Sequence, residues 1–328
     1  MRSTTARLLI KRIFSSLIIL FLIITFLFFL VRISPGDPVQ KFVNPTLSPK
    51  LAEQVRESLN LDKPIHMQYI GFLTSAISGD LGVSYNFRRD VTSVILEYLP
   101  FTLLFTSVSF IFQMIVSFWL SIKSVKKING LFDRALSNIT LLIYATPVFV
   151  IGVFLVFIFS ELLNIFPSSG LSSYDSADFS FWARLTDYIY HLILPIITLS
   201  LIEIAIFYKY LRDNLEDVYN KLFVLNLRAS GVSEKDILLK HVIPNAINPL
   251  ITIAGIELGI MLGGTLIVEV VFGLPGMGRL IIEAIFTRDY PLVIGCSLVV
   301  SFLIIFSNFL ADIIKAFLDK RLLTGSLN

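Results

Sequence analysis

RASGVSEKDILLKHVIPNA, residues Arg228 to Ala246, is the middle of a polar segment, Lys209 to Asn248, that separates two long apolar stretches. The segment predicts two short amphipathic helices around Gly231. A glycine commonly ends one helix, and Ser233 followed three residues later by Asp236 is a start signal for the next. The apolar face of the first helix is formed by residues at helical spacing: Leu215, Val218, Tyr219, Leu222 and Phe223. Two such helices beside a membrane offer a surface that another protein can bind.

The apolar stretches on either side belong to a polytopic membrane protein. Of 328 residues, 55% are hydrophobic and 16% are charged, a composition too apolar for a soluble domain. Four uncharged runs reach the length of about 20 residues that a spanning helix needs: 13–31, 98–122, 135–160 and 290–311. Two further runs, 188–208 and 242–268, each contain one glutamate. The sequence therefore predicts an all-α protein with six transmembrane helices, at 13–31, 98–122, 135–160, 188–208, 249–272 and 290–317.

The distribution of Lys and Arg predicts the orientation, because retained basic residues mark the cytoplasmic side. Residues 1–12, the connection after the second span and the polar segment 209–248 are rich in Lys and Arg, whereas the connection 161–187 contains only Arg184. Both termini and the polar segment are thus expected in the cytoplasm. Residues 32–97 become an extracytoplasmic, lid-like subdomain with one helix beginning near Ser48, and 98–328 become the transmembrane core. The net charge of +3 follows from this topology and gives no reason to expect nucleic-acid binding.

Sequence motifs of enzymes and of metal sites are missing. The chain contains no phosphate-binding GxxxxGK[ST], no HExxH or CxxC, and no GxSxG. The three histidines, His66, His191 and His241, fall in different parts of the predicted topology, and Cys296 has no partner for a disulfide. We therefore expect no catalysis, no metal site and no cofactor bound by this chain, so that energy for any transport must come from another subunit.

Charged and small residues within the spans are candidates for a transport path. Glu203, Glu257 and Glu269 lie in or at the edge of spans, where an unpaired carboxylate costs roughly 2.5–3.5 kcal/mol or more. For Glu203 and Glu257 two roles are open, lining a pathway or packing against a partner subunit and local backbone. Gly263 and Gly264, with two earlier glycines of the same span, allow either close helix packing or a gate between two subunits.

The motifs, taken in order, resemble the permease subunits of ABC importers of the oligopeptide, dipeptide and nickel type, from Arg12 to about Arg321. They are PGDP (35–38), LNLDKP (59–64), GDLG (79–82), Thr146-Pro147, FPSSG (166–170), LPIITL (194–199), GGTLIVEVVFGLPGMG (263–278) and RDYP (288–291). The polar segment 209–248 is similar to the coupling loop of that family. It differs from the usual pattern at Leu227 and Ser230, where the family has smaller or more basic residues.

The resemblance implies the architecture of a type I ABC importer in the bacterial cytoplasmic membrane. It implies a second homologous permease subunit, cytoplasmic ATPase subunits that hold ATP and Mg²⁺, and an extracytoplasmic binding protein. Residues implied in ATPase coupling are Arg228, Ala229, Gly231, Ser233, Asp236, His241, Pro244 and Asn245. Glu269 matches the family's glutamate before VF and is expected to stabilise the following turn. The expected substrate is a di- or oligopeptide, with nickel or a metal chelate as the alternative and a self-sufficient secondary carrier as the alternative from another class.

Overall fold

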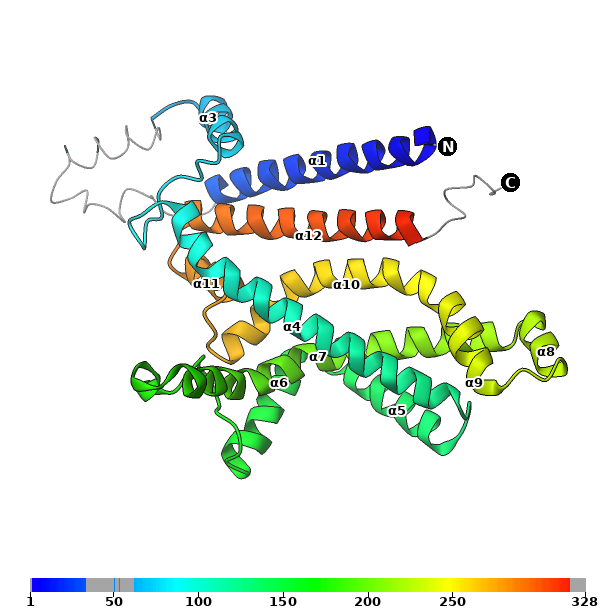
Figure 1. Cartoon of the computed structure of the whole chain (residues 1–328). Helices are drawn as coiled ribbons and strands as arrows, with labels where there is room; N and C mark the ends of the chain where they lie inside the picture. Colours follow the sequence, from blue (N-terminus) through cyan, green and yellow to red (C-terminus); the bar gives the residue numbers. More distant parts are fainter. Residues whose placement is uncertain (1, 34–49, 51–52, 54–61, 319–328) are drawn as a thin grey trace.

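The computed structural model describes residues 2–33, 50, 53 and 62–318, and within them the chain is helical (Figure 1). The α-helices are α1 (Arg2–Ile33), α3 (Ile65–Ile77), α4 (Val91–Val125), α5 (Leu131–Ala145), α6 (Val148–Val156), α7 (Phe181–Tyr219), α8 (Leu222–Ala229), α9 (Glu234–Asp236), α10 (Ile243–Val271), α11 (Met277–Phe286) and α12 (Tyr290–Leu318). In the described part, β-structure is limited to one isolated antiparallel bridge between Val83 and Asp90. The all-α prediction is confirmed there. The helix expected near Ser48 lies outside the described residues, apart from Lys50 and Glu53.

Several of these helices are long and apolar enough to cross a membrane. Four qualify singly: α4, α7, Ile253–Val271 of α10 and Tyr290–Ala311 of α12. The pair α5 and α6, with the π-helical turn that continues α6 to Leu162, counts as a fifth if it is one bent span, and α1 contributes a shorter apolar stretch, Phe14–Leu30. The described helices thus support a multi-span membrane protein. Six spans and the orientation of the termini remain predictions.

A seam of small polar side chains holds α4 against α7. The buried polar residues of α4 recur every three or four positions and so share one face: Thr102, Thr106, Ser109, Gln113, Ser117, Ser121 and Ser124. Ser200 Oγ donates to the Ser109 carbonyl at 3.2 Å, and Ser121 Oγ donates to the Tyr208 carbonyl at 3.1 Å. Small residues let the two helices approach closely, and hydrogen bonds between helices add stability that apolar contact cannot supply in lipid.

Glycines perform the corresponding role between α10 and α12. A Cβ at Gly255 would lie 1.8 Å from Ala311 Cβ, and one at Gly259 would lie 3.5 Å from Ile304. The close packing predicted for this span is confirmed at these two glycines. Gly263 and Gly264 continue α10, which Figure 1 shows between α12 and α7.

The third predicted span is not one straight helix. The helices on either side of Thr146 and Pro147 meet at 104°. Thr146 is extended at ψ 128° and Pro147 precedes the first residue of α6, a conformation that the proline ring imposes on the residue before it. A proline inside a span predicts a kink, and at Pro147 the chain breaks fully. Pro195, also inside a predicted span, leaves α7 undivided.

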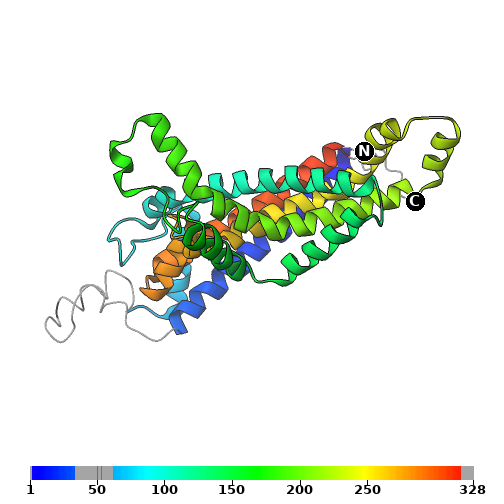
Figure 2. The same cartoon turned by 90° about the horizontal axis from the view of Figure 1, so that it is seen from below.

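The bundle has two distinct ends, as Figures 1 and 2 show: α8 and α9 lie at one, and α3 and α11 lie at the other. At the α3 end, the GDLG and RDYP motifs meet. Buried Asp289 accepts hydrogen bonds from Ser84 Oγ at 2.5 Å and from the Asn86 amide at 2.9 Å. This carboxylate fixes the short turn between Val83 and Asp90 onto the start of α12.

Candidate functional site

The polar segment 209–248 folds into a bracket that projects from the bundle. Its first part corrects the sequence prediction, because the expected single helix over Leu215 to Phe223 is divided. α7 continues from the bundle to Tyr219, and α8 begins at Leu222. The Lys221 amide donates to the Val218 carbonyl and closes α7, while Lys221 itself is extended at ψ 146°. The break turns α8 back so that Val224, fully buried, packs in the same cluster as Leu215 and Val218.

Gly231 forms the sharp turn at the tip of the bracket. Its φ is +80°, a left-handed conformation in which side chains other than glycine are strained. The turn returns hydrogen bonds to α8: the Gly231 amide donates to the Arg228 carbonyl at 3.0 Å, and the Val232 amide donates to the Leu227 carbonyl at 3.1 Å. A Cβ built at Gly231 meets nothing within 4 Å, so the outer side of the turn is open. The helix stop predicted at this glycine is confirmed.

Ser233 begins the second helix, as predicted. Its Oγ accepts from the Asp236 amide at 3.2 Å and donates to the Asp236 carboxylate at 2.8 Å. Arg228 Nε donates to Glu234 Oε1 at 2.6 Å, which joins the two helices across the glycine turn. Hydrogen bonding from this guanidinium lowers the pKa of Glu234. Because both side chains are exposed, the pair contributes at most about 1 kcal/mol, and less in salt.

The inner side of the bracket is apolar and anchored. Ile237, Leu238 and Val242 are buried with Val125 at the end of α4, in one cluster with the apolar residues of α7 and α8. A π-helical turn, Ile237–Val242, runs without a gap into α10. The bracket is therefore seated on α4, joined by continuous helix to α10 and packed against α7 through Val224, so a force applied to it reaches these helices.

The outer side of the bracket combines charge with exposed apolar side chains. Of the residues named from the sequence, Arg228, Ala229, Gly231 and Ser233 are exposed around the tip, whereas His241, Pro244 and Asn245 lie on the stem into α10. Sequence reasoning missed the large exposed apolar residues Leu225 and Leu239 beside them, and it placed Leu222 on the apolar face of the first helix, whereas Leu222 is exposed. The signal that could have found Leu225 and Leu239 is a large apolar side chain within a polar segment. Leu227, which departs from the family pattern, packs against the buried cluster and Ser230 caps α8, so the bulk of Leu227 faces inward.

The candidate path residues divide into two places. Glu203 of α7 is buried and hydrogen-bonds to Glu257 of α10, and each keeps one carboxylate oxygen without a partner in the described part of the chain. Glu269 lies twelve residues beyond Glu257 on α10, about 18 Å along the helix axis. The structure therefore brings Glu203 and Glu257 together and separates both from Glu269.

Glu269 caps the start of α11. Its fully buried carboxylate accepts from Thr102 Oγ1 at 2.8 Å and from the amides of Gly278 and Arg279 at 2.7 and 3.1 Å. Amides at a helix start lack partners within their own helix, and a carboxylate satisfies them and complements the helix dipole. Glu269 thus joins α4, α10 and α11 around the turn that the sequence assigned to it.

No group of three or more His, Cys, Asp or Glu side chains that could hold a metal ion occurs among residues 2–33, 50, 53 and 62–318. His66 lies in α3, His191 in α7 and His241 in the bracket.

Known proteins are similar to this chain over nearly its whole length. The family model described as "Binding-protein-dependent transport system inner membrane component" matches residues 113–324, and the N-terminal model of the same description matches residues 5–106. The oligopeptide transport system permease protein AppB of Bacillus subtilis (strain 168) is 32% identical over 95% of this chain and 98% of its own length.

Relatives with other named substrates are equally similar. The nickel import system permease protein NikB of Staphylococcus aureus (strain bovine RF122 / ET3-1) is 31% identical over 94% of this chain and 90% of its own length. The glutathione transport system permease protein GsiC of Shigella flexneri serotype 5b (strain 8401) is 31% identical over 95% and 97%. This chain therefore belongs to the binding-protein-dependent inner membrane components, the multi-pass permease subunits of bacterial ABC importers, and is a transport subunit and not an enzyme.

Proposed function

We propose that this chain forms half of the translocation pathway of a peptide importer, with the bracket 209–248 as the surface on which a cytoplasmic ATPase docks. One observation carries the proposal: the bracket is exposed and partly apolar on its outer side, yet continuous with α10 and packed through Val224 on α7, the two helices that carry Glu257 and Glu203. Movement of a docked partner is then transmitted as rigid-body movement of the two helices. The coupling residues are those named from the sequence, together with Leu222, Leu225 and Leu239.

In this proposal the chain crosses the membrane six times, with α1 and the bent pair α5–α6 each crossing once and both termini in the cytoplasm. A second, homologous permease completes the pathway, and a binding protein delivers the substrate to the outer face. ATP and Mg²⁺ are bound in the ATPase subunits. Alternating access follows: ATP-driven closure of the ATPases moves the brackets, the path opens outward to accept substrate, and hydrolysis resets it.

Peptides are the proposed substrates because two of the three relatives described above carry peptide transport in their names, oligopeptide and glutathione. Nickel is the second candidate, since NikB is as similar as GsiC. The test is uptake into vesicles that contain the complete transporter and its own binding protein. ATP-dependent entry of labelled di- or oligopeptides supports the proposal. Entry of nickel, free or chelated, with no peptide uptake would make nickel the substrate. Uptake driven by an ion gradient without ATPase would refute the proposal of an ATP-driven importer.

The pair Glu203–Glu257 is proposed to line this path. Gln113, whose amide nitrogen and oxygen both lack partners in the described part, supports a polar lining. It lies between Ser109 and Ser117, which bond to α7 at Ser200 and Ile204, so it is level with Glu203. Buried polar groups without partners are costly, and a hydrated or substrate-contacting wall removes that cost.

Replacing Glu257 by Gln is expected to lower peptide uptake at least ~10-fold while leaving the yield of assembled complex within about twofold, because the amide keeps the shape and removes the charge. Tenfold corresponds to about 1.4 kcal/mol. Initial uptake rates per mole of purified complex provide the measurement. Glu161→Gln, at an exposed carboxylate on the turn after α6, is the matched control and should transport normally. Wild-type uptake by the Glu257 variant would exclude Glu257 from the path.

A further inference from the structure

Within the described part of the chain, helix α5 has almost no apolar interface with other elements. Of its 15 residues, Asp133 and Thr140 alone are buried. Its large apolar side chains point away from the bundle and are mostly exposed: Leu131, Phe132, Ile139, Leu141, Leu142 and Tyr144. In a membrane, burying apolar side chains against protein gains little over burying them in lipid. The position of α5 must therefore depend on polar contacts.

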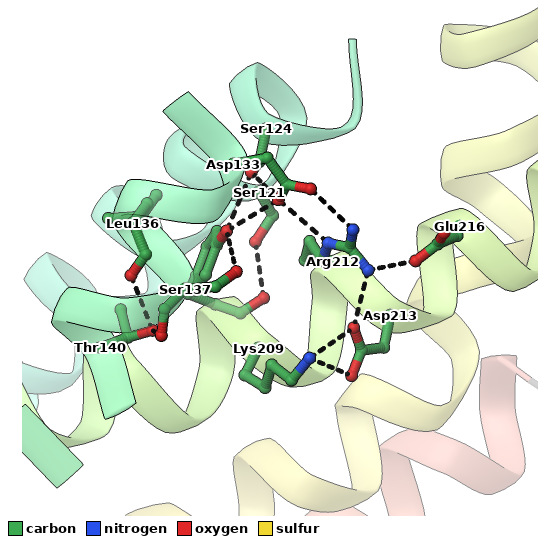
Figure 3. Close-up of polar contacts among 11 residues, drawn as sticks. Ser121, Ser124, Asp133, Leu136, Ser137, Thr140, Lys209, Arg212, Asp213 and Glu216 are labelled. Atoms are coloured by element: carbon green, nitrogen blue, oxygen red, sulfur yellow. Dashed lines mark hydrogen bonds and ion pairs between the residues drawn. The ribbon is translucent and has the colours of Figure 1, made fainter. Parts of the chain in front are cut away.

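The polar contacts converge on Asp133, as Figure 3 shows. Arg212 of α7 donates from Nε to Oδ1 at 3.1 Å and from Nη2 to Oδ2 at 2.7 Å. Ser124 Oγ and the Asn129 amide donate to the same carboxylate, and Tyr208 Oη donates at 3.2 Å. The Asp133 and Arg212 side chains are only 2% and 9% exposed. A bidentate, buried pair of this kind fixes orientation as well as distance.

Arg212 is itself held in place on α7. Its Nη1 donates to Asp213 at 3.1 Å and also bonds to Glu216, one turn further along. Arg212 lies in the α7 part of the bracket, seven residues, about two helical turns, before α7 ends at Tyr219. The guanidinium thus connects the α7 part of the bracket with α5 through Asp133. Asp133 in turn connects to the end of α4 through Ser124.

The opposite end of α5 is the 104° break at Thr146 and Pro147. There Pro147 has no amide to continue the helix, so α5 and α6 can change their relative direction without losing a helical hydrogen bond at that residue. One end of α5 is therefore a break, and the other is held by the buried polar contacts that converge on Asp133. The direction of α5 can therefore follow the element that holds its N-terminal end.

We infer that Asp133 and Arg212 are positioning residues that make α5 move with α7 when the bracket is driven. The inference rests on the proposed function of the bracket as the ATPase docking surface. The Asp133–Arg212 pair stays closed through the transport cycle, so the movement of α7 is carried to α5 and, through the break, to α6.

The first test is a double-mutant cycle with Asp133→Asn, Arg212→Gln and the double variant in the complete transporter. We expect each single variant to lower peptide uptake at least ~10-fold while ATP hydrolysis is retained, so the ATP consumed per peptide rises. Because the two residues act as one unit, the double variant should be no worse than either single variant. Glu97→Gln, which breaks an exposed ion pair with Arg89 at the other end of α4 from Ser124, is the control and should change the ratio less than twofold.

Losses that multiply in the double variant, or an unchanged ratio of ATP to peptide, would overturn the inference. A purely structural role would lower uptake and hydrolysis together with the amount of assembled complex. If the variants fail to assemble, the wild-type pair can still be tested by distance measurements between spin labels at Ile139 of α5 and Tyr210 of α7. Both side chains are exposed, and the only cysteine of the chain, Cys296, is buried and does not compete for label.

With Asp133 and Arg212 intact, the 139–210 distance should be the same without nucleotide and with ATP trapped, while labels on the two permease subunits move relative to each other. A 139–210 distance that changes with nucleotide would show that the pair opens and would overturn the inference. Labels at Ile115 of α4 and Tyr210 report the α4–α7 seam as a control. These distances need no peptide, so they remain informative if peptide uptake by the wild-type complex fails and the proposed substrate is wrong.

Discussion

Replacing Gly231 by tryptophan is expected to lower the affinity of the permease for its ATPase at least ~10-fold and to abolish ATP-driven uptake. Two effects combine. The left-handed φ of +80° costs a residue with a side chain roughly 1–2 kcal/mol. The indole also projects from the open outer side of the turn, where nothing lies within 4 Å of a Cβ and where the partner is proposed to dock. Binding of purified ATPase to the permease complex, with uptake per complex, is the measurement.

Gly79 provides a matched control at the opposite end of the molecule. It follows the C-cap of α3 as Gly231 follows the C-cap of α8, its φ is +81°, and a Cβ there also meets nothing within 4 Å. Gly79→Trp therefore imposes the same backbone strain and should leave ATPase binding intact. Gly231→Asn should bind nearly normally, because asparagine tolerates this conformation. If Gly231→Trp binds ATPase as well as Gly79→Trp does, the tip of the bracket is not part of the docking surface.

Replacing Gly278 by alanine is expected to destabilise the protein by about 3 kcal/mol or more. The added Cβ would lie 2.2 Å from Leu266 Cα and 2.8 Å from its backbone nitrogen, atoms that cannot rotate away. α11 must then shift from α10, which lengthens the hydrogen bond from the Gly278 amide to Glu269 and leaves a buried carboxylate short of donors. Overpacking and the loss of a buried hydrogen-bond network are among the few causes of such large effects.

Thermal unfolding of the purified complex in detergent, together with its yield from membranes, measures this loss. Gly71→Ala is the matched control: Gly71 lies inside α3 and a Cβ there meets nothing within 4 Å, so alanine should be neutral or stabilising by about 0.5–1 kcal/mol. Glu269→Gln should fall between the two, because the amide keeps one acceptor oxygen where the carboxylate has two. Equal stability of the Gly278 and Gly71 variants would contradict the close approach of α11 to α10.

The membrane character, the family and the bracket could be predicted from the sequence because each rests on local patterns: uncharged runs, ordered motifs, and the Gly231–Ser233 stop and start signals. The division of the bracket's first helix could not. Its apolar residues keep helical spacing through Lys221, and it is burial of Val224 against α7 that requires the chain to turn. Likewise, Pro147 predicted a kink, but the extent of the turn depends on what the uniformly apolar residues on either side pack against.

Contacts between residues that are distant in the chain could not be predicted, for a different reason. Asp133 and Arg212 are 79 residues apart, and each alone resembles an ordinary charge at the end of a span. Glu203 and Glu257 were both recognised as carboxylates in unusual places, yet only the packing of α7 on α10 brings them into hydrogen-bonding contact. The sequence shows which residues are unfavourable to bury alone, and the fold shows which of them are buried against each other.

The polar seam of α4 also has a consequence for how the protein is made. Synthesis proceeds from the N-terminus, so α4 enters the membrane before the ribosome has completed α7. Until α7 arrives, Ser117 and Ser121 face lipid, or the insertion machinery, without the α7 carbonyls to which they donate in the finished bundle. Because of this polar seam, α4 depends on the insertion machinery until α7 is present to pack against it.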